Sequence, residues 1–397
     1  MGELGSLKNG MNFSKEAMGI GFPFVNLQNI FGNNVIDVTN LGKAMASDSQ
    51  LKDYNLLNGD VLFVRSSVKL EGVGEAALVP QNLENTTYSG FIIRFRDEYG
   101  LDNNFKRFLF GIESVRNQIM AQATNSANKN ISQTVLENLC LKIPNKSEQE
   151  KIGLYFSNLD HLITLHQRKC EETKTLKKYM LQKMFPQNGN SVPEIRFWGF
   201  TEDWEQRKLG EVIEGVSKKN TDGLYTQDDI LACSLGTELD RKTIFYGLRS
   251  TEDSVKSYRI VNIGNVIYTK SPIKGYPNGI VRTCKIVDGI VPSLYCVYKK
   301  KENISIPIDT RFIQSYLEDK GRLAQYLCPL VNVGARNNVN ITDKEFLEGV
   351  IKIPMTVEEQ TKIVDALEKI NHLITLHQKK CDELQNIKKF MLQNMFI

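Results

Sequence analysis

The chain has 397 residues, enough for two or three globular units, and its 41% hydrophobic and 24% charged residues are typical of a protein with packed cores. This composition excludes a disordered tail and a fibrous repeat. The net charge of +4 is small for the length, so bulk charge neither favours nor excludes nucleic acid as a partner. The absence of a long apolar run and of a signal segment, with seven scattered cysteines and no Cys-x-x-Cys, indicates a reduced, cytoplasmic chain.

The first segment, residues 1–145, has a mixed, strand-rich pattern. β-branched and aromatic runs predict strands at 61–64 and 90–95, and residues 103–120 predict a short helix. The following segment, residues 146–188, predicts one long helix. Ser147 and Glu150 form a capping-box pattern after Pro144, and Pro186 marks the end of the helix.

The second half of the chain repeats this order. Residues 189–355 are again strand-rich, with strands predicted at 266–268, 279–287 and 290–298 and a short helix at 311–327. Residues 356–397 predict a second long helix, with Thr356 and Glu359 as its capping box. The fold class expected is α+β: two similar strand-rich regions separated by two long helices.

An internal repeat connects the two halves. Residues 160–185 and 371–396 are identical at 17 of 26 positions at an offset of 211 residues, which indicates an internal duplication. A weaker match joins residues 59–66 to 264–271: in both, a Gly-Asp or Gly-Asn turn enters an apolar run that ends in a basic residue and a serine. The chain is therefore expected to be a tandem pseudo-dimer.

The long helices carry apolar positions at alternating spacings of three and four, which is typical of a coiled-coil seam. Because the chain supplies two such helices, antiparallel pairing within one chain is the simplest arrangement. Two separate intermolecular coiled coils are the alternative. The residues predicted to pair the helices are Ile152, Leu159, Leu162, His166, Leu176, Met180, Ile363, Ile370, Leu373, His377, Leu384 and Met391.

Motifs of the common enzyme classes are missing. The sequence contains no Gly-x4-Gly-Lys-Ser/Thr loop for a nucleotide and no Asn/Asp-Pro-Pro-aromatic loop of an amino-methyltransferase. All four histidines lie in the predicted long helices, so neither strand-rich segment has one for Ser-His or Cys-His catalysis. Packing is the preferred role for these histidines. We expect a non-catalytic chain without a metal site.

A repeated signature follows each strand-rich segment. Ile143-Pro144 precedes Glu148-Gln149-Glu150-Lys151-Ile152, and Ile353-Pro354 precedes Glu359-Gln360-Thr361-Lys362-Ile363. A lead-in, Pro193-Glu194-Ile195-Arg196-Phe197 with Trp204-Glu205 and Lys208-Leu209-Gly210-Glu211, opens the second region. In these features the chain resembles the DNA-specificity (S) subunits of Type I restriction–modification enzymes. The lead-in has no counterpart before Met1, so either a late translation start or a trimmed sequence is expected.

The resemblance implies a division of labour. Residues 1–145 and 189–355 would be the first and second DNA target-recognition domains, each reading one half of a split target in double-stranded DNA. The conserved helices at 146–188 and 356–397 would form an antiparallel coiled coil that sets the half-site spacing and docks two modification (methyltransferase) subunits. Restriction (motor-nuclease) subunits would join through these. No cofactor is expected on this chain; S-adenosylmethionine, ATP and Mg²⁺ would be bound by the partners.

Readout of DNA needs hydrogen-bonding side chains for base edges and cations for phosphates. Polar and basic clusters recur at matching places in both halves, which favours them over ordinary surface loops. The predicted DNA-binding residues are Lys8, Asn9, Asn12, Ser14, Lys15, Arg65, Ser66, Ser67, Lys69, Asn128 and Lys129 in the first half, and Lys218, Lys219, Lys270, Ser271, Lys274, Tyr276, Arg336, Asn337 and Asn338 in the second. Lys177-Lys178 and Lys388-Lys389 are interpreted as a solvated helix face.

The leading hypothesis is a non-catalytic, sequence-specific DNA-binding subunit with a bipartite, asymmetric target. The alternative is a coiled-coil structural adaptor without DNA specificity. An autonomous nuclease or methyltransferase is the least favoured reading.

Overall fold

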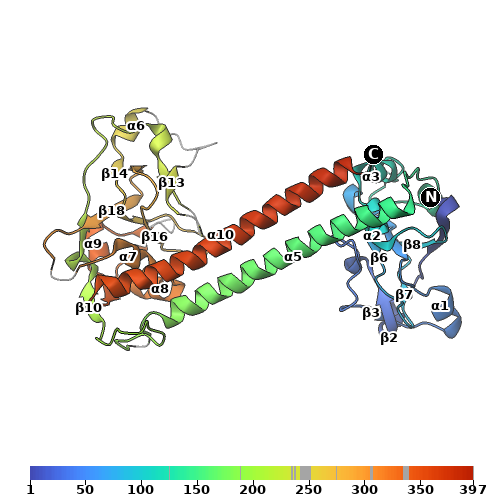
Figure 1. The fold of residues 1–397 in the computed structure, drawn as a ribbon, viewed down its shortest axis with the longest axis horizontal. Coiled ribbons are helices and arrows are strands. Elements are labelled where there is room, and N and C mark those ends of the chain that lie inside the picture. Colours follow the sequence, from blue (N-terminus) through green and yellow to red (C-terminus); the bar gives the residue numbers. More distant parts are fainter. Residues whose placement is uncertain are drawn as a thin grey trace. The chain divides into compact units, whose positions relative to one another are not determined.

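The computed structural model describes residues 1–124, 126–187, 189–233, 236, 238–241, 252–273, 275–304, 307–333 and 339–396, except for the side chains of residues 15, 332, 333, 339 and 340. The chain divides into two compact units. Unit 1 consists of Met1–Arg168 and Gln378–Ile397, and unit 2 of Lys169–His377. Each unit contains one strand-rich region and a part of each long helix (Figure 1).

Unit 1 is built on a four-stranded antiparallel sheet in the order β1-β8-β4-β6. Its strands are β1 (Gly5–Asn9), β4 (Val61–Val64), β6 (Ala76–Leu78) and β8 (Ile92–Asp97). Alternate side chains of β4 enter different cores: Val61 and Phe63 belong to one cluster, Leu62 and Val64 to another. Because β4 is buried on both faces, its sequence is an unbroken apolar run.

Smaller elements of unit 1 surround this sheet. A three-stranded sheet in the order β3-β2-β7 is formed by β2 (Met18–Val25), β3 (Gly42–Ala44) and β7 (Thr87–Tyr88). A two-stranded ladder joins β5 (Ser66–Ser67) to β9 (Lys129–Asn130). The short helices are α1 (Asp48–Asp53), α2 (Asn103–Leu109), α3 (Glu113–Ala121) and α4 (Gln133–Glu137).

Unit 2 has a four-stranded sheet in the order β11-β18-β15-β16, which repeats the strand order of unit 1. Its strands are β11 (Ile213–Gly215), β15 (Val266–Thr269), β16 (Ile280–Thr283) and β18 (Tyr295–Lys300). Two-stranded pairs complete the unit: β10 (Glu205–Lys208) with β21 (Val350–Ile353), β12 (Leu231–Ala232) with β13 (Asp240–Arg241), β14 (Arg259–Val261) with β17 (Gly289–Val291), and β19 (Asn332–Val333) with β20 (Val339–Asn340).

The short helices of unit 2 are α6 (Glu252–Lys256), α7 (Thr310–Leu317), α8 (Lys320–Leu327) and α9 (Asp343–Leu347). The single helices expected at 103–120 and 311–327 are each two helices, α2 and α3 in unit 1 and α7 and α8 in unit 2. Gly111 interrupts the first pair, and Asp319 starts α8 anew by accepting a 3.0 Å hydrogen bond from the Arg322 backbone N–H.

The long helices are α5 (Lys146–Lys183) and α10 (Val357–Asn394), with 38 residues each and a length of about 57 Å. Asn145, and not Ser147, caps α5: its Oδ1 accepts a 3.0 Å hydrogen bond from the Glu148 backbone N–H. Thr356 caps α10 as predicted, since its hydroxyl accepts from the Glu359 N–H at 3.3 Å, but the Glu359 carboxylate bonds elsewhere.

In both units α5 and α10 pack against each other. In unit 1 the Cys381 thiol lies 3.8 Å from the carbonyl oxygen of Ile163, and Lys388 pairs with Asp160. From Ile163 to Asp160 the residue numbers fall along α5, while the contacted residues rise from Cys381 to Lys388 along α10. The pairing is therefore antiparallel. In unit 2 the Cys170 thiol lies 3.8 Å from the carbonyl oxygen of Ile374. The predicted α+β fold with two paired long helices is confirmed.

The buried face of each long helix follows a heptad pattern. The sequence interpretation predicted only some of its positions correctly. Leu162, Leu176 and Leu373 were expected in the seam but are 40%, 48% and 45% exposed. From Leu159 the buried positions advance by four to Ile163, not by three to Leu162. The remaining predicted pairing residues are buried or half-buried. The seam positions that the interpretation missed are Phe156, Ile163, Cys170 and Lys177 on α5 and Leu367, Ile374, Cys381 and Lys388 on α10.

Candidate nucleic-acid interface

The turn before β8 gathers two of the predicted DNA-binding clusters of unit 1. The Arg65 backbone N–H donates a 2.8 Å hydrogen bond to the carbonyl of Phe91, and its guanidinium donates to the carbonyl of Gly90 at 3.3 Å. On the other side, Asn12 lies so close to Gly90 that a Cβ there would be 2.1 Å from the Asn12 Oδ1. The cluster around Asn12 and the cluster around Arg65 therefore share one surface.

The third cluster of unit 1 joins the second through the β5–β9 ladder. Ser66 pairs with Asn130 and Ser67 with Lys129, and the Ile131 N–H donates to the Arg65 carbonyl at 3.0 Å. An open cavity of about 540 Å³ lies beside this ladder. Its polar lining includes the predicted residues Ser66, Ser67, Lys69 and Asn128, and its apolar lining includes Phe31, Val68 and Phe91. Residues about 60 positions apart in the sequence thus line a single cavity.

The remaining predicted residues of unit 1 lie at or after the end of β1. The Lys8 ammonium donates to the carbonyl of Asp53 at 3.0 Å and lies 4.5 Å from the centre of the Tyr54 ring. Asn9 ends the strand, and its Oδ1 is buried without a hydrogen-bond partner among the described residues. Ser14 is exposed. Hydrogen bonds from the Glu16 backbone and the Ser14 hydroxyl lower the pKa of Glu16. Of Lys15 only the backbone is described.

In unit 2, Lys270 occupies the position that Arg65 has in unit 1. It follows the central strand β15, and its backbone N–H donates to the carbonyl of Leu294, immediately before β18, at 3.1 Å. Lys270 also acts on α9: hydrogen bonds from Thr342 lower the pKa of Glu345, and the Lys270 charge adds to this shift. Ser271 follows and is half-buried.

Lys218 and Lys219 are exposed on the segment that leaves β11, where Lys219 bridges to Arg259. Lys274, Arg336, Asn337 and Asn338 lie outside the described residues. In the described part of unit 2, therefore, the predicted clusters are not brought to one cavity, whereas two of the predicted clusters of unit 1 are.

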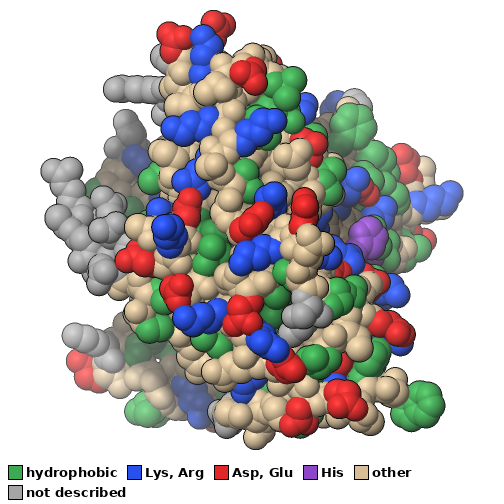
Figure 2. Space-filling view, turned by 90° about the vertical axis from the view of Figure 1, so that its left-hand side faces the viewer, with side chains coloured by type: hydrophobic (Ala, Val, Ile, Leu, Met, Phe, Trp, Pro, Cys, Tyr) green, Lys and Arg blue, Asp and Glu red, His purple; other side chains and the backbone are tan. Residues whose placement is uncertain are grey.

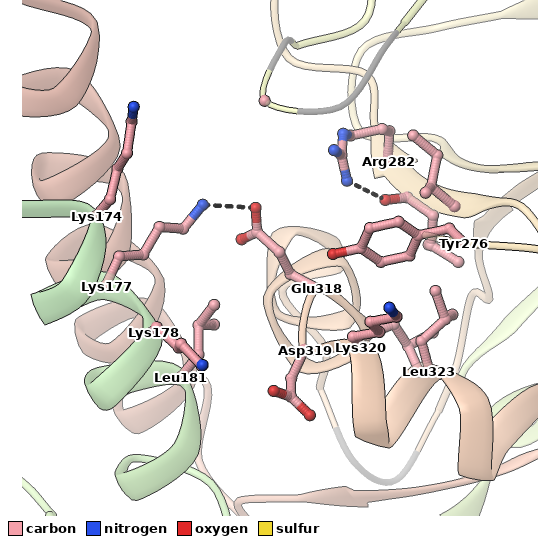
Figure 3. Close-up of a pocket in the computed structure, with 14 residues that line it drawn as sticks. Lys174, Lys177, Lys178, Leu181, Tyr276, Arg282, Glu318, Asp319, Lys320 and Leu323 are labelled. Atoms are coloured by element: carbon pink, nitrogen blue, oxygen red, sulfur yellow. Dashed lines mark hydrogen bonds and ion pairs between the residues drawn. The ribbon is translucent and has the colours of Figure 1, made fainter. Parts of the chain in front are cut away.

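Tyr276 lines a different cavity, of about 400 Å³, that does not include Lys270 or Ser271 (Figure 3). Lysines of α5 form one wall of it, and Glu318 and Arg282 lie opposite (Figure 3). Burial and the nearby Glu318 carboxylate raise the pKa of Tyr276. Lys177 forms a 2.7 Å ion pair with Glu318, and its repeat equivalent Lys388 pairs with Asp160, so both ammonium groups already have carboxylate partners.

Charges are mixed on the face of the molecule shown in Figure 2, where Lys and Arg side chains alternate with Asp and Glu. No broad surface of one sign stands out among the described atoms of that face. On this face, therefore, contacts to phosphates would have to come from local groups of cations.

The repeated signature has a common geometry in both units. Gln149 is buried, accepts from the Asp102 N–H at 3.0 Å and donates to the Pro144 carbonyl at 2.9 Å. Gln360 accepts from the Asp309 N–H at 2.8 Å and donates to the Pro354 carbonyl at 3.1 Å. Asp102 and Asp309 cap α2 and α7, so each glutamine fastens a long helix to its strand-rich region.

Glu359, an acidic residue of the second signature, is buried and hydrogen-bonded. The Arg196 guanidinium makes two hydrogen bonds to Glu359, of 2.7 and 2.9 Å, and the Trp204 indole N–H donates to the same carboxylate at 3.2 Å. The lead-in residues are thereby attached to the start of α10. Within the described residues, no group of His, Cys, Asp or Glu is placed to hold a metal ion. In that same part of the chain, no helix is long and apolar enough to cross a membrane.

Comparison with known proteins gives a consistent result. A model of the type I restriction modification DNA specificity domain matches residues 1–175. A protein of Methanocaldococcus jannaschii named "Putative type I restriction enzyme MjaX specificity subunit" is 24% identical over 405 residues, which covers 96% of this chain and 88% of that protein. The EcoKI specificity subunit of Escherichia coli is 28% identical over 151 residues, 38% of this chain and 32% of that protein.

A solved structure supports the fold. The crystal structure of the Type I restriction–modification S subunit from M. genitalium superimposes with a TM-score of 0.57, covering 100% of this chain and 94% of that one at 15% identity.

Recognition of a DNA sequence is typical of the matched family, whose cofactors are generally carried by the modification and restriction subunits. The specificity-domain match, the relative that spans almost the whole chain and the duplicated fold all agree with the signature read from the sequence. By these matches the chain is similar to the specificity subunits of Type I restriction–modification systems, the non-catalytic subunits of those complexes.

Proposed function

We propose that this subunit reads a bipartite, asymmetric DNA target, with the strand-rich region of each unit reading one half. The observation that carries the proposal is the repeated sheet: β1-β8-β4-β6 in unit 1 and β11-β18-β15-β16 in unit 2 share one strand order. In the two sheets, the equivalent strands β4 and β15 are each followed by a cation, Arg65 or Lys270, and then by a serine. Two sheets with the same strand order, one in each unit, suit a DNA target with two halves.

The side chains on the two scaffolds support an asymmetric target. Arg65 is followed by Ser66-Ser67-Val68-Lys69, whereas Lys270 is followed by Ser271-Pro272-Ile273-Lys274. Two identical readers related by a two-fold axis would favour a palindrome. Different side chains at equivalent positions instead favour two unlike half-sites.

Within unit 1 the proposed readers are the residues that share one surface. Asn12, Ser66, Ser67 and Asn128 carry the donors and acceptors needed for base edges, and the nearby cations Arg65, Lys69 and Lys129 suit the phosphates. In unit 2 the corresponding proposal names Lys218, Lys219, Lys270 and Ser271. Tyr276 is a weaker candidate, because it lines a separate cavity beside α5.

The long helices would dock two modification subunits through a second apolar stripe outside the seam. On α5, Leu162, Leu165, Leu176 and Tyr179 are 36–48% exposed; their repeat equivalents on α10, Leu373, Leu376, Ile387 and Phe390, are 43–62% exposed. The four positions on each helix fall within an arc of about 100°. Exposed apolar stripes on a helix usually mark a binding surface.

The stripe also fits the number of partners. Unit 1 contains Leu162 and Leu165 of α5 with Ile387 and Phe390 of α10, and unit 2 contains the other four residues. Each unit therefore has one equivalent set, which suits one modification subunit per unit. These partners would carry S-adenosylmethionine, and restriction subunits that use ATP and Mg²⁺ would join through them.

The direct experiment incubates the chain and its modification subunits with random-sequence duplexes and sequences the bound pool. We expect an enriched motif with two unlike halves separated by a spacer of fixed length and free sequence. A bound pool without such a motif would favour a structural adaptor instead. Incubation of the chain alone with S-adenosylmethionine and DNA is expected to give no methyl transfer, and transfer would contradict its non-catalytic role.

A further inference from the structure

Both sheets expose a large apolar side chain at the same point. Phe91 immediately precedes β8 in unit 1, and Leu294 immediately precedes β18 in unit 2. The two side chains are 59% and 56% exposed. β8 and β18 hold equivalent places in the two sheets: β8 lies between β1 and β4, and β18 lies between β11 and β15. Both residues lie in runs that predicted strands, 90–95 and 290–298, and neither was among the predicted DNA-binding residues.

The same backbone hydrogen bond holds each residue beside a cation. The carbonyl of Phe91 accepts from the Arg65 N–H at 2.8 Å, and the carbonyl of Leu294 accepts from the Lys270 N–H at 3.1 Å. Each unit therefore pairs a residue with an apolar side chain, through the backbone, with a basic residue that directly follows β4 or β15. The two regions, whose loop sequences differ, show the same combination of properties at this place.

The surroundings in unit 1 indicate a mixed ligand surface. The open cavity of about 540 Å³ combines Phe91, Phe31 and Val68 with the hydroxyls of Ser66 and Ser67 and the amide of Asn128. Val68 is 78% exposed. Apolar groups left in water contribute little to folding, so a cluster of them among hydrogen-bonding groups suits a ligand that is itself partly polar and partly apolar.

The edge of a base pair in the major groove of DNA has this mixed character. It presents donors and acceptors together with one apolar group, the 5-methyl of thymine, and the phosphates alongside attract Lys and Arg. Phe91 has Arg65 beside it and Lys69 at the same cavity, and Leu294 has Lys270 beside it. The charge at both places favours DNA over an apolar protein partner.

We infer that Phe91 and Leu294 are equivalent specificity residues, each of which packs against the 5-methyl group of a thymine in its own half of the target. The inference rests on the proposed function, because it requires that each region reads one half-site. It adds the chemical group that is read and the residue that reads it.

The test uses the complete complex with modification subunits and the target found by bound-pool sequencing. Each thymine of the target is replaced in turn by deoxyuridine, which lacks only the methyl group. The unmodified complex is expected to lose affinity about fourfold at one position in each half, which corresponds to one methyl group removed from contact. F91A is expected to bind more weakly and to lose this sensitivity in the first half only, and L294A in the second half only.

Matched controls keep the test independent of folding. F91L retains an apolar contact and is expected to keep the methyl sensitivity. Tyr99 and Ile263 are 66% and 58% exposed elsewhere in units 1 and 2, so Y99A and I263A are expected to bind like the unmodified complex. If F91A and L294A remain sensitive to loss of the methyl, or if no thymine shows sensitivity, the inference is wrong while the proposed function stands. If the bound pool has no split motif, both are wrong.

Discussion

Two buried glutamines explain at the residue scale why the signature recurs. Gln149 and Gln360 each bond a proline carbonyl and the N–H of an aspartate that caps a short helix. Without these side chains, a donor and an acceptor of the backbone would be left buried and unpaired, which is costly. The signature therefore holds the fold together and is distant in role from the residues proposed to read DNA.

Q360A is expected to lower the free energy of unfolding of unit 2 by about 2 kcal/mol, because the Pro354 carbonyl and the Asp309 N–H lose their shared partner. Urea unfolding followed by tryptophan fluorescence measures this, since Trp198 and Trp204 both belong to unit 2. Q182A is the matched control, because Gln182 is exposed on α5. Equal stability of the two variants would contradict a clamping role for Gln360.

At the element scale, each long helix has two apolar faces, one buried in the seam and one exposed face that is proposed to bind a partner. The buried seam includes Cys170 and Lys177, which are not obvious core residues, while Leu162 and Leu176 lie outside it. The prediction that Leu162 and Leu176 lie in the seam was therefore wrong. It followed apolar residues spaced by three onto the neighbouring, exposed face of the helix. The heptad pattern predicted that the helices pair. Hydrophobicity alone does not show which of two adjacent apolar stripes is buried against the second helix and which stays exposed.

The outer stripe predicts the stoichiometry of the complex. L162E/L165E is expected to remove the modification subunit of unit 1, and L373E/L376E that of unit 2, because each places two charges in an apolar contact. Native mass spectrometry should show a fall from two modification subunits to one for either variant and to none for the combination. Q167E is the control: Gln167 is exposed on α5, about 140° round the helix from Leu162. Two bound subunits in both variants would exclude this stripe as the docking surface.

At the scale of the whole molecule, the sequence predicted more of the architecture than of the site. The internal repeat was sufficient to predict two similar regions and two helices. The composition of the units was not visible, because periodicity along α5 and α10 does not reveal that each helix contributes to both units.

The sequence also did not show which of the predicted site residues lie close together in the folded chain. Asn12, Arg65 and Asn128 were predicted from local loops, yet only folding brings them around the turn at Gly90. Phe91 and Leu294 were missed as site residues, because both lie in apolar runs predicted as strands, and such a run does not show which of its side chains is exposed.

If the paired helices set the distance between the two readers, the spacer of the target has to follow their length. We consider four residues inserted after Arg168 in α5 and four after His377 in α10, where the chain passes between units. Each insertion adds about 6 Å of rise and turns the apolar stripe by only about 40°, so the seam should survive. At about 3.4 Å per base step, the spacer is expected to lengthen by one or two base pairs with both half-sites unchanged. An active complex with an unaltered spacer would show that the helices only dock partners.

The central claim is that each strand-rich region reads one half of the target independently of the other. The most direct measurement replaces residues 189–355 with the corresponding region of a specificity subunit that has a different target, and then sequences the methylome of cells that carry the hybrid complex. The predicted result is a new sequence in one half-site, with the other half-site and the spacer length unchanged. A change in both half-sites, or in neither, would contradict independent reading by two regions.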